Sequence, residues 1–379
     1  MAWRLDHLML AAVVLAVCFV AACSRGTAEE RTREPVVAGQ FYPSRRIELK
    51  EAVEHYLSEG AKKAKVEEAP IALIAPHAGY QFSGRCAGVA YATVKGRSYR
   101  RVIILAVNHS RYPVRGAAIV DVDAYRTPLG KVPVDRAACD QLLKAKLFGT
   151  HPAADRSEHS LEVHLPFLQE AIGSFELVPI TVGHVTGEDA AAIAAELRKV
   201  VDDGTLVVAS SDFTHYGEQY GYAPFHVNIR QNLEKLDTGA VELILKRDAA
   251  GFSRYLDRTG ATICGRNPIT VLLNLLPDKA TGQLLNYYTS GALAGDYSLS
   301  VGYAASAFTA PGKWGRPAEP ASAKGEPTKS APAGPPQAAG AESDPPKGKD
   351  DTYAVTRLFM LPCGTVPGDQ VTAESAPSR

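Results

Sequence analysis

The chain has 379 residues, 46% of them apolar and 22% charged, and its 41 Lys and Arg residues balance 41 Asp and Glu residues. A net charge of zero predicts neither a strongly basic surface nor a nucleic-acid partner. The length accommodates one large α/β domain or two smaller ones, each with a sizeable core. Six Cys over this length do not form a disulfide scaffold.

The N-terminus has the pattern of an export signal. Arg4 is followed by an apolar run from Leu8 to Val20 and by small residues before Cys23. A membrane span needs about 20 residues, so the short run favours a processed signal over an uncleaved anchor. The letters "VAAC" resemble the lipobox of bacterial lipoproteins. This resemblance implies a signal peptide over residues 1–23, lipidation of Cys23, and a lipid-anchored place in the bacterial cell envelope, at the periplasmic or outer-membrane face or otherwise extracytoplasmic.

Composition divides the remainder of the chain. Residues 24–34 are polar and are expected to form a tether, and residues 35–310 form the globular part. Residues 311–350 contain Pro, Ala, Gly, Ser and Lys but no aliphatic residue larger than Ala, which predicts a disordered linker. The tail over 351–379 holds one apolar patch, Val355 to Leu361, which either docks, binds a partner or stays disordered.

Apolar, strand-like runs alternate with helical segments between residues 35 and 310. This alternation predicts one α/β domain with a mostly parallel central sheet flanked by helices. In such sheets, sites lie beyond the carboxyl ends of strands. The expected strands are 71–77, 101–109, 175–183, 205–213, 283–293 and 297–308, and residues 116–130 are expected to form a strand and turn. The expected helices are 46–64, 83–94, 135–146, 160–172, 187–203 and 267–276, and residues 225–248 are expected to be helical in parts.

Two histidines follow expected strands in the same way. His77 lies in "APHAGYQFSG" and His109 in "LAVNHSR". Each alone is compatible with a loop imidazole bonded to backbone. Because both occupy equivalent strand exits, we expect them to face one crevice.

The stretch "SSDFTHYG" follows the expected strand 205–213. If the chain turns helical after Ser211, Asp212 and His215 share one helix face at a spacing of three. Asp212 then either caps the helix by accepting backbone N–H bonds or orients an imidazole. His215 is a candidate acid/base residue in the second case.

The stretch "RSEHSLEVHLPFLQ" is dense in ionisable groups. Glu158 and His159 are candidates to line a pocket, and a continuous helix would place His159 and Glu162 on one face. The alternative is a charged helix N-terminus with acidic residues in its first turn.

The stretch "ATICGRNPI" places a thiol before a helix. Cys264 is a candidate nucleophile or soft metal ligand, or simply a small buried apolar residue. Arg266 would bind a carboxylate or phosphate of a ligand, or pair with an acid such as Asp212.

Seven motifs in one order resemble those of the Memo-like proteins, which include the bacterial AmmeMemoRadiSam system protein B members. They span Pro35 to Phe308 and are "AGQFYPS", "APHAGYQFSG", "AYRTPLG", "EHSLEVHLPFLQ", "SSDFTHYG", "ICGRNPI" and "GDYSLSVGYAASAF". The resemblance implies a fold similar to class III extradiol dioxygenases, which use non-haem Fe(II). It also implies AMMECR1-like and radical SAM proteins as partners by family association.

The resemblance further implies roles for single residues. His77 and His109 match the two histidine ligands of the dioxygenases, and Cys264 falls where those enzymes have a carboxylate. His215 matches the acid/base histidine, with Asp212 beside it. A thiolate is a soft ligand, so the implied metal is Fe(II) or copper.

Three functions follow from these residues. The first is a metal-dependent redox or dioxygenase-like enzyme with a His/His/Cys pocket. The second is a non-catalytic binding module that recognises a peptide or small anionic ligand with Glu158, His159 and Arg266. The third is a hydrolase with Cys264 as its nucleophile.

Overall fold

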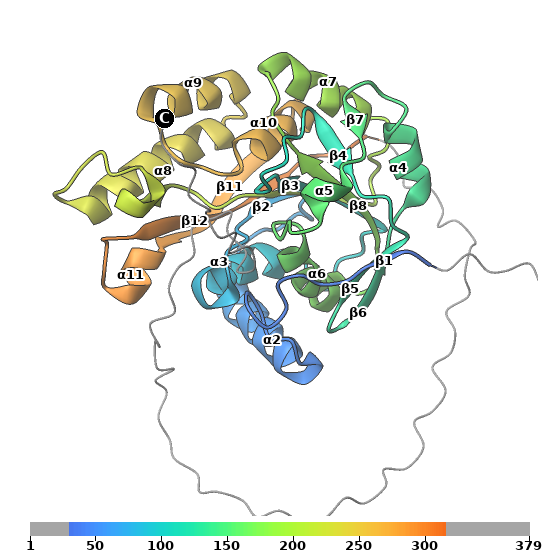
Figure 1. Ribbon diagram of the computed structural model, residues 1–379, viewed down its shortest axis with the longest axis horizontal. Coiled ribbons are helices and arrows are strands. Elements are labelled where there is room, and N and C mark those ends of the chain that lie inside the picture. Colours follow the sequence, from blue (N-terminus) through green and yellow to red (C-terminus); the bar gives the residue numbers. More distant parts are fainter. Residues whose placement is uncertain (1–29, 316–379) are drawn as a thin grey trace, which may run out of the picture.

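The computed structural model describes residues 30–315, which form one body of helices around a central sheet (Figure 1). The expected signal peptide with Cys23, the first part of the tether, and everything from residue 316 onward lie outside the described residues. No helix between residues 30 and 315 is both long and apolar enough to cross a membrane.

The central sheet has nine strands. These are β2 (Ala72–Ala75), β3 (Arg101–Val107), β4 (Ala117–Ile119), β7 (Phe148–Gly149), β8 (Glu176–Val182), β9 (Thr205–Ser210), β10 (His215–Tyr216), β11 (Thr281–Thr289) and β12 (Ser300–Thr309). Their order is β10-β12-β2-β9-β3-β8-β4-β7, with β11 on the other edge of β12. The middle four, β2-β9-β3-β8, are mutually parallel, as expected. The outer strands β12 and β4 join them antiparallel, so the whole sheet is mixed.

Helices cover both faces of this sheet. They are α2 (Arg46–Ala61), α3 (Tyr80–Ala92), α4 (Arg136–Leu142), α5 (Pro152–Asp155), α6 (Leu165–Ile172), α7 (Gly187–Leu197), α8 (Ile229–Leu245), α9 (Ala249–Thr259), α10 (Arg266–Leu275) and α11 (Ser290–Ala294). Helices α2, α3 and α6 lie on one side, and α7, α9 and α10 on the other (Figure 1). Strands β3 and β9 are therefore buried at every position, which explains their unbroken runs of Val, Ile and Leu.

The folded part begins before Pro35. Thr32 and Arg33 form β1, which pairs in parallel with β5 (Ala124–Thr127), and β5 continues into β6 (Gly130–Pro133). Thr32 and Arg33, which were expected to belong to the tether, thus belong to a second sheet with the order β1-β5-β6.

The folded part also continues beyond Ala310. The backbone N–H of Trp314 donates to Asp203 Oδ1 at 3.0 Å, and its indole Nε1–H donates to Thr205 O at 2.9 Å. Residues 311–315, expected to belong to the linker, therefore pack against the loop before β9 and its first residue.

Three expected elements are divided in the structure. The segment 116–130 forms β4 of the central sheet, β5 of the second sheet and the first residue of β6. The expected helix 160–172 consists of a 3₁₀ turn, η1 (Glu162–His164), followed by α6, whose first turn contains Pro166. Proline is tolerated there because it lacks only an N–H that has no helical partner. The expected strand 283–293 ends at Thr289, whose side chain accepts the Ala292 N–H at 3.2 Å and starts α11.

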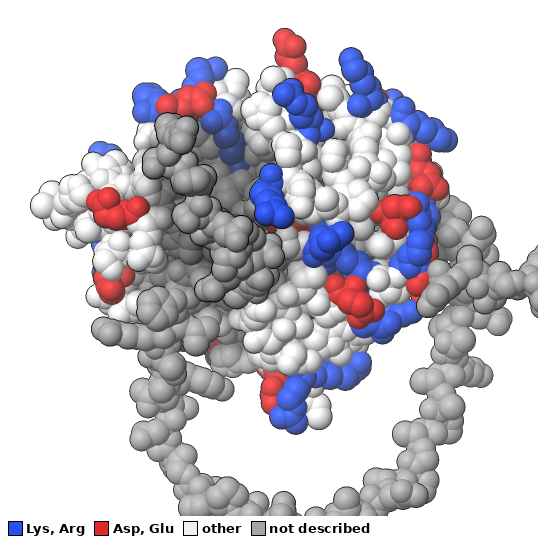
Figure 2. All heavy atoms as spheres, in the orientation of Figure 1, with Lys and Arg blue, Asp and Glu red and all other residues white. Residues whose placement is uncertain are grey.

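Charges of both signs are interspersed on the surface. On the face drawn in Figure 2, Lys and Arg side chains stand beside Asp and Glu side chains, and no region of a single sign dominates. This distribution agrees with the balanced composition of the chain.

Candidate metal centre

The ends of two parallel strands bring His77 and His109 together. His77 follows β2 by two residues and His109 follows β3 by two residues, and β9 lies between these strands. Because parallel strands end at the same edge of a sheet, the two rings meet with centroids 5.1 Å apart.

Cys264 joins this pair from the turn before α10. Its Sγ lies 3.3 Å from His77 Nε2. One ligand atom from each of His77, His109 and Cys264 lies within 4.8 Å of the others. The three side chains come from positions up to 187 residues apart, so the tertiary fold assembles the cluster.

Gly265 permits this approach. A Cβ at this position would lie 2.2 Å from Ser211 Cβ and 2.8 Å from the Ser210 carbonyl oxygen. Only glycine therefore lets the turn pass so close to the end of β9. A hydrogen bond beside this close approach holds the thiol in place: the Asp212 backbone N–H donates to Cys264 Sγ at 3.3 Å.

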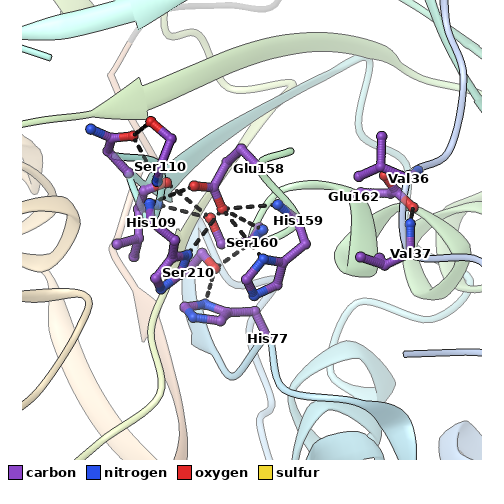
Figure 3. Close-up of polar contacts among 12 residues, drawn as sticks. Val36, Val37, His77, His109, Ser110, Glu158, His159, Ser160, Glu162 and Ser210 are labelled. Carbon is purple, nitrogen blue, oxygen red and sulfur yellow. Dashed lines mark hydrogen bonds and ion pairs between the residues drawn. The ribbon is translucent and has the colours of Figure 1, made fainter. Parts of the chain in front are cut away.

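Both histidines are held through Nδ1. His77 Nδ1 lies 2.6 Å from Ser210 Oγ, and His109 Nδ1 lies 3.0 Å from Glu158 Oε1 (Figure 3). An oxygen partner on one ring nitrogen is the arrangement that orients metal-binding histidines and fixes their tautomer.

Glu158 holds His109 and does not line open space. Its side chain is buried, and its oxygens accept N–H bonds from the backbone of His109 (2.6 Å), His159 (2.9 Å) and Ser160 (2.8 Å) as well as the His109 ring. Burial would raise the pKa of this carboxyl, but the hydrogen bonds from His109 and the nearby imidazoles lower it to about 2. Glu158 is thus an anionic support for His109.

His159 lies against the cluster, whereas Glu162 does not. The His159 ring stacks on His109 at 4.8 Å and meets Phe41 edge-on at 4.7 Å. Glu162 lies apart (Figure 3) and accepts bonds from Val36 N and from other groups of the N-terminal segment. The expectation that one helix face presents His159 and Glu162 is wrong, because the helix begins only at Leu165.

The expected helix after Ser211 is also absent. The Phe213 N–H donates to Gly302 O at 2.7 Å, and the Gly302 N–H donates to Thr214 O at 3.0 Å. The segment is therefore extended against β12 and leads into β10. Asp212 is not a helix cap: its Oδ1 accepts the backbone N–H of His77 at 2.8 Å, and Oδ2 lies 3.9 Å from His77 Nε2.

The tautomer of neutral His215 follows from one contact. Its Nδ1 lies 3.0 Å from the carbonyl oxygen of Thr262. A carbonyl oxygen only accepts, so Nδ1 carries the proton and Nε2 carries the lone pair. Tyr220 packs edge-on against the ring at 5.2 Å.

The electrostatics of the cluster keep His77 neutral. Burial lowers the pKa of His77 well below its usual value, and repulsion from other imidazoles lowers it further. Those imidazoles are His109, His159, His164 and His215. A neutral ring has a lone pair to offer, which is the state a metal ligand requires.

Arg266 pairs with a different acid from the one expected. Its Nη1 lies 2.7 Å from Asp257 Oδ1, and both side chains are substantially exposed. The expectation of a pair with Asp212 is therefore wrong, since Asp212 holds the His77 backbone.

Two residues around the cluster were missed from the sequence. Ser210 contacts the His77 ring, and Asp237 accepts bonds from Thr214 N (3.1 Å), Thr214 Oγ1 (2.5 Å) and Tyr287 OH (2.9 Å). A signal for Asp237 exists, because it lies within the apolar stripe of α8 formed by Leu233, Ala240, Val241 and Ile244. A carboxylate there needs buried partners. Ser210 carries no such signal.

The donor set fits a transition metal. Two imidazoles and a thiol suit soft or borderline ions, and supports on both Nδ1 atoms fix the ring orientations. Asp212 adds a carboxylate beside His77.

This α/β fold and its histidine and cysteine cluster define the class of protein. Residues 33–307 match the family model of Memo-like proteins, and the chain belongs to this family. The match confirms the resemblance of the motifs.

Individual relatives match this chain over nearly their whole length. The chain is 34% identical over 292 residues to "Protein MEMO1" of Homo sapiens, covering 73% of this chain and 97% of that protein. It is 36% identical over 291 residues to "MEMO1 family protein MK0963" of Methanopyrus kandleri, covering 73% and 98%. A solved structure, uncharacterized protein JW3007 from Escherichia coli K12, aligns over 63% of this chain and 99% of its own at a TM-score of 0.41 and 14% identity.

Proposed function

We propose that the protein is a metal-dependent redox or dioxygenase-like protein in which His77, His109 and Cys264 hold Fe(II) or copper. The observation that carries this proposal is that their ligand atoms lie within 4.8 Å of one another. The thiolate favours these metals over Mg²⁺ or Ca²⁺. When bound, such a metal supplies one-electron and O₂ chemistry that side chains cannot perform.

The surrounding residues then have distinct tasks. His215 gives or takes a proton at Nε2, because Thr262 O keeps its Nδ1 protonated. Asp212 fixes the backbone of His77 and keeps a carboxylate oxygen beside its ring. Glu158 fixes His109, and burial of His77 excludes water from that side of the cluster.

The test is anaerobic titration of metal-free protein with Fe(II) or Cu(I). Cys264→Ser should weaken binding by more than the about 10- to 100-fold typical of losing an orienting partner. His151→Gln, an exposed histidine outside the cluster, is the matched control and should bind as wild type. Metal-loaded wild type should then consume O₂ with a suitable substrate. Failure to bind either ion, or binding of Zn²⁺ alone, contradicts the proposal.

One contact favours a second candidate, a hydrolase with Cys264 as nucleophile and His77 as base. The 3.3 Å between Sγ and Nε2 is close enough for proton transfer between thiol and imidazole. This candidate expects turnover without metal and its loss on alkylation of Cys264. If alkylated and untreated metal-free proteins both lack hydrolytic turnover, the candidate fails.

The binding-module alternative has weaker support. This alternative expects Arg266 to contact an anionic ligand, but the Arg266 guanidinium is paired with Asp257. No contact in the described part of the chain favours this alternative over the two catalytic ones.

We further propose that the chain is exported and anchored by a lipid on Cys23. The support is the sequence pattern before Cys23. Cys23→Ala should release the protein from the membrane fraction and abolish incorporation of labelled palmitate. If Cys23→Ala stays in the membrane fraction and the wild type incorporates no labelled palmitate, the proposal is contradicted.

A further inference from the structure

Two buried histidines meet at one hydroxyl. Ser210 Oγ lies 2.6 Å from His77 Nδ1 and 2.8 Å from His164 Nε2. Its third partner is the carbonyl oxygen of Ser160 at 2.7 Å. Ser210 lies at the end of β9, and all these side chains are buried.

Counting protons assigns the direction of each bond. A hydroxyl has one hydrogen and two lone pairs, and a carbonyl oxygen can only accept. The hydrogen of Ser210 therefore goes to Ser160 O, and both lone pairs must accept from N–H groups. His77 is thus protonated at Nδ1 and His164 at Nε2.

The outer end of the network agrees with this assignment. His164 Nδ1 lies 2.8 Å from Tyr91 OH. With the His164 proton on Nε2, its Nδ1 accepts and the phenol donates, which is the role a neutral tyrosine hydroxyl can fill. Every polar hydrogen from Tyr91 to Ser160 then has an acceptor.

We propose that Ser210 is a positioning residue that holds His77 as the Nδ1–H tautomer, with His164 and Tyr91 fixing the hydroxyl from behind. The lone pair of His77 is thereby placed on Nε2, the nitrogen that faces Cys264 Sγ at 3.3 Å. The opposite tautomer would direct an N–H at the ligand cluster and would have to change before a metal could bind. The consequence for metal affinity rests on the proposed function, whereas the tautomer assignment does not.

The tautomer can be read directly in the wild-type protein. In metal-free protein labelled with ¹⁵N-histidine, long-range ¹H–¹⁵N spectra should show His77 with a protonated Nδ1 and a bare Nε2. Comparison with His77→Gln assigns the signals. A His77 protonated at Nε2 alone would overturn the proposal, and this readout needs no variant of Ser210.

Substitution then tests the effect on the metal. Ser210→Ala removes the acceptor, so His77 should populate both tautomers and Fe(II) affinity should fall by about 10- to 100-fold. Ser210→Thr keeps the hydroxyl and should restore the Nδ1–H signal and most of the affinity. Tyr91→Phe removes only the outer donor and should leave His77 at Nδ1–H. Unchanged tautomer and affinity in folded Ser210→Ala contradict the proposal.

Failure of the two proposals is distinguishable. If wild type binds neither Fe(II) nor Cu(I) but His77 is the Nδ1–H tautomer, the metal function fails and the role of Ser210 stands. If wild type binds metal and metal-free His77 is protonated at Nε2, only the role of Ser210 fails.

Discussion

At the residue scale, the charge on Asp237 depends on the fold. The side chain is fully buried, and burial raises its pKa from 3.8 to about 6, although bonds from Thr214 and Tyr287 act in the opposite direction. The folded state therefore binds this proton more tightly than the unfolded state. The resulting stabilisation is fully present below the unfolded pKa and is lost as the pH rises through the folded pKa.

Asp237→Asn should remove this pH dependence while keeping an acceptor for Thr214. The free energy of unfolding of wild type minus that of the variant should fall by about 2 kcal/mol between about pH 4.5 and about pH 7.5. Urea unfolding of both proteins at several pH values measures it. A difference that is constant over this range is the contrary result.

Part of the candidate site is readable from single residues. His77 and His109 were found because each follows an apolar strand, and parallel strands end at a common edge. Cys264 was a candidate ligand because it precedes a helix, but only the family resemblance grouped it with the two histidines. Ser210 could not be recognised because its role is set by contacts 46 and 133 residues away in the sequence.

At the element scale, β1 acts through Arg33. Its guanidinium binds Glu162 Oε2 at 3.0 Å and Asp155 Oδ2 at 3.0 Å, and it donates to the carbonyl oxygen of Glu158 at 2.6 Å. The turn that carries Glu158 is therefore held by the N-terminal strand. Glu158 in turn holds His109, so β1 supports the candidate metal centre from a distance.

Arg33→Met should destabilise the fold by about 3–5 kcal/mol, because it leaves buried Glu162 without its cation. Arg31→Met is the matched control, since Arg31 pairs with Asp121 and Asp123 at the half-exposed surface and its loss should change stability little. Chemical denaturation measures both. Equal effects of the two substitutions would show that burial of Arg33 is not what matters.

The junction of β9 and α10 depends on Gly265. Gly265→Ala forces a Cβ to 2.2 Å from Ser211 Cβ, so it should cost about 1–3 kcal/mol by overpacking and displace the adjacent Cys264. Fe(II) affinity should fall as well. Gly187→Ala, at the open start of α7 with no atom within 4 Å of the added Cβ, should preserve both stability and affinity. Wild-type affinity in Gly265→Ala contradicts this account of the turn.

Elements were predicted best where burial fixed the pattern. β3 and β8 lie within expected strands, because a short continuous apolar run is typical of a parallel strand that is covered on both faces. The stretch "SSDFTHYG" misled because Ser and Asp favour helix starts locally. Its backbone groups instead bond to Gly302 of β12, about 90 residues later, and no local pattern reports such a partner.

At the scale of the whole molecule, both ends of the domain extend beyond the expected 35–310. Composition placed the boundaries where polar or Pro-rich sequence begins, yet single anchoring residues lie further out. Arg33 is buried at one end, and Trp314 binds Asp203 and Thr205 at the other. Composition cannot predict a domain boundary that is set by two or three contacts, because a short polar segment with one large side chain has the composition of a linker.

These outer contacts predict where the chain can be cut. A chain spanning residues 30–315 retains β1 and both Trp314 hydrogen bonds, so it is the reference for the comparison. A chain spanning 35–310 loses Arg33 and Trp314 together. Loss of the Arg33 ion pairs alone should cost about 3 kcal/mol or more, and the turn carrying Glu158 loses its support. If the longer and the shorter chain have equal stability and equal Fe(II) affinity, the domain is the expected 35–310, and β1 does not support His109.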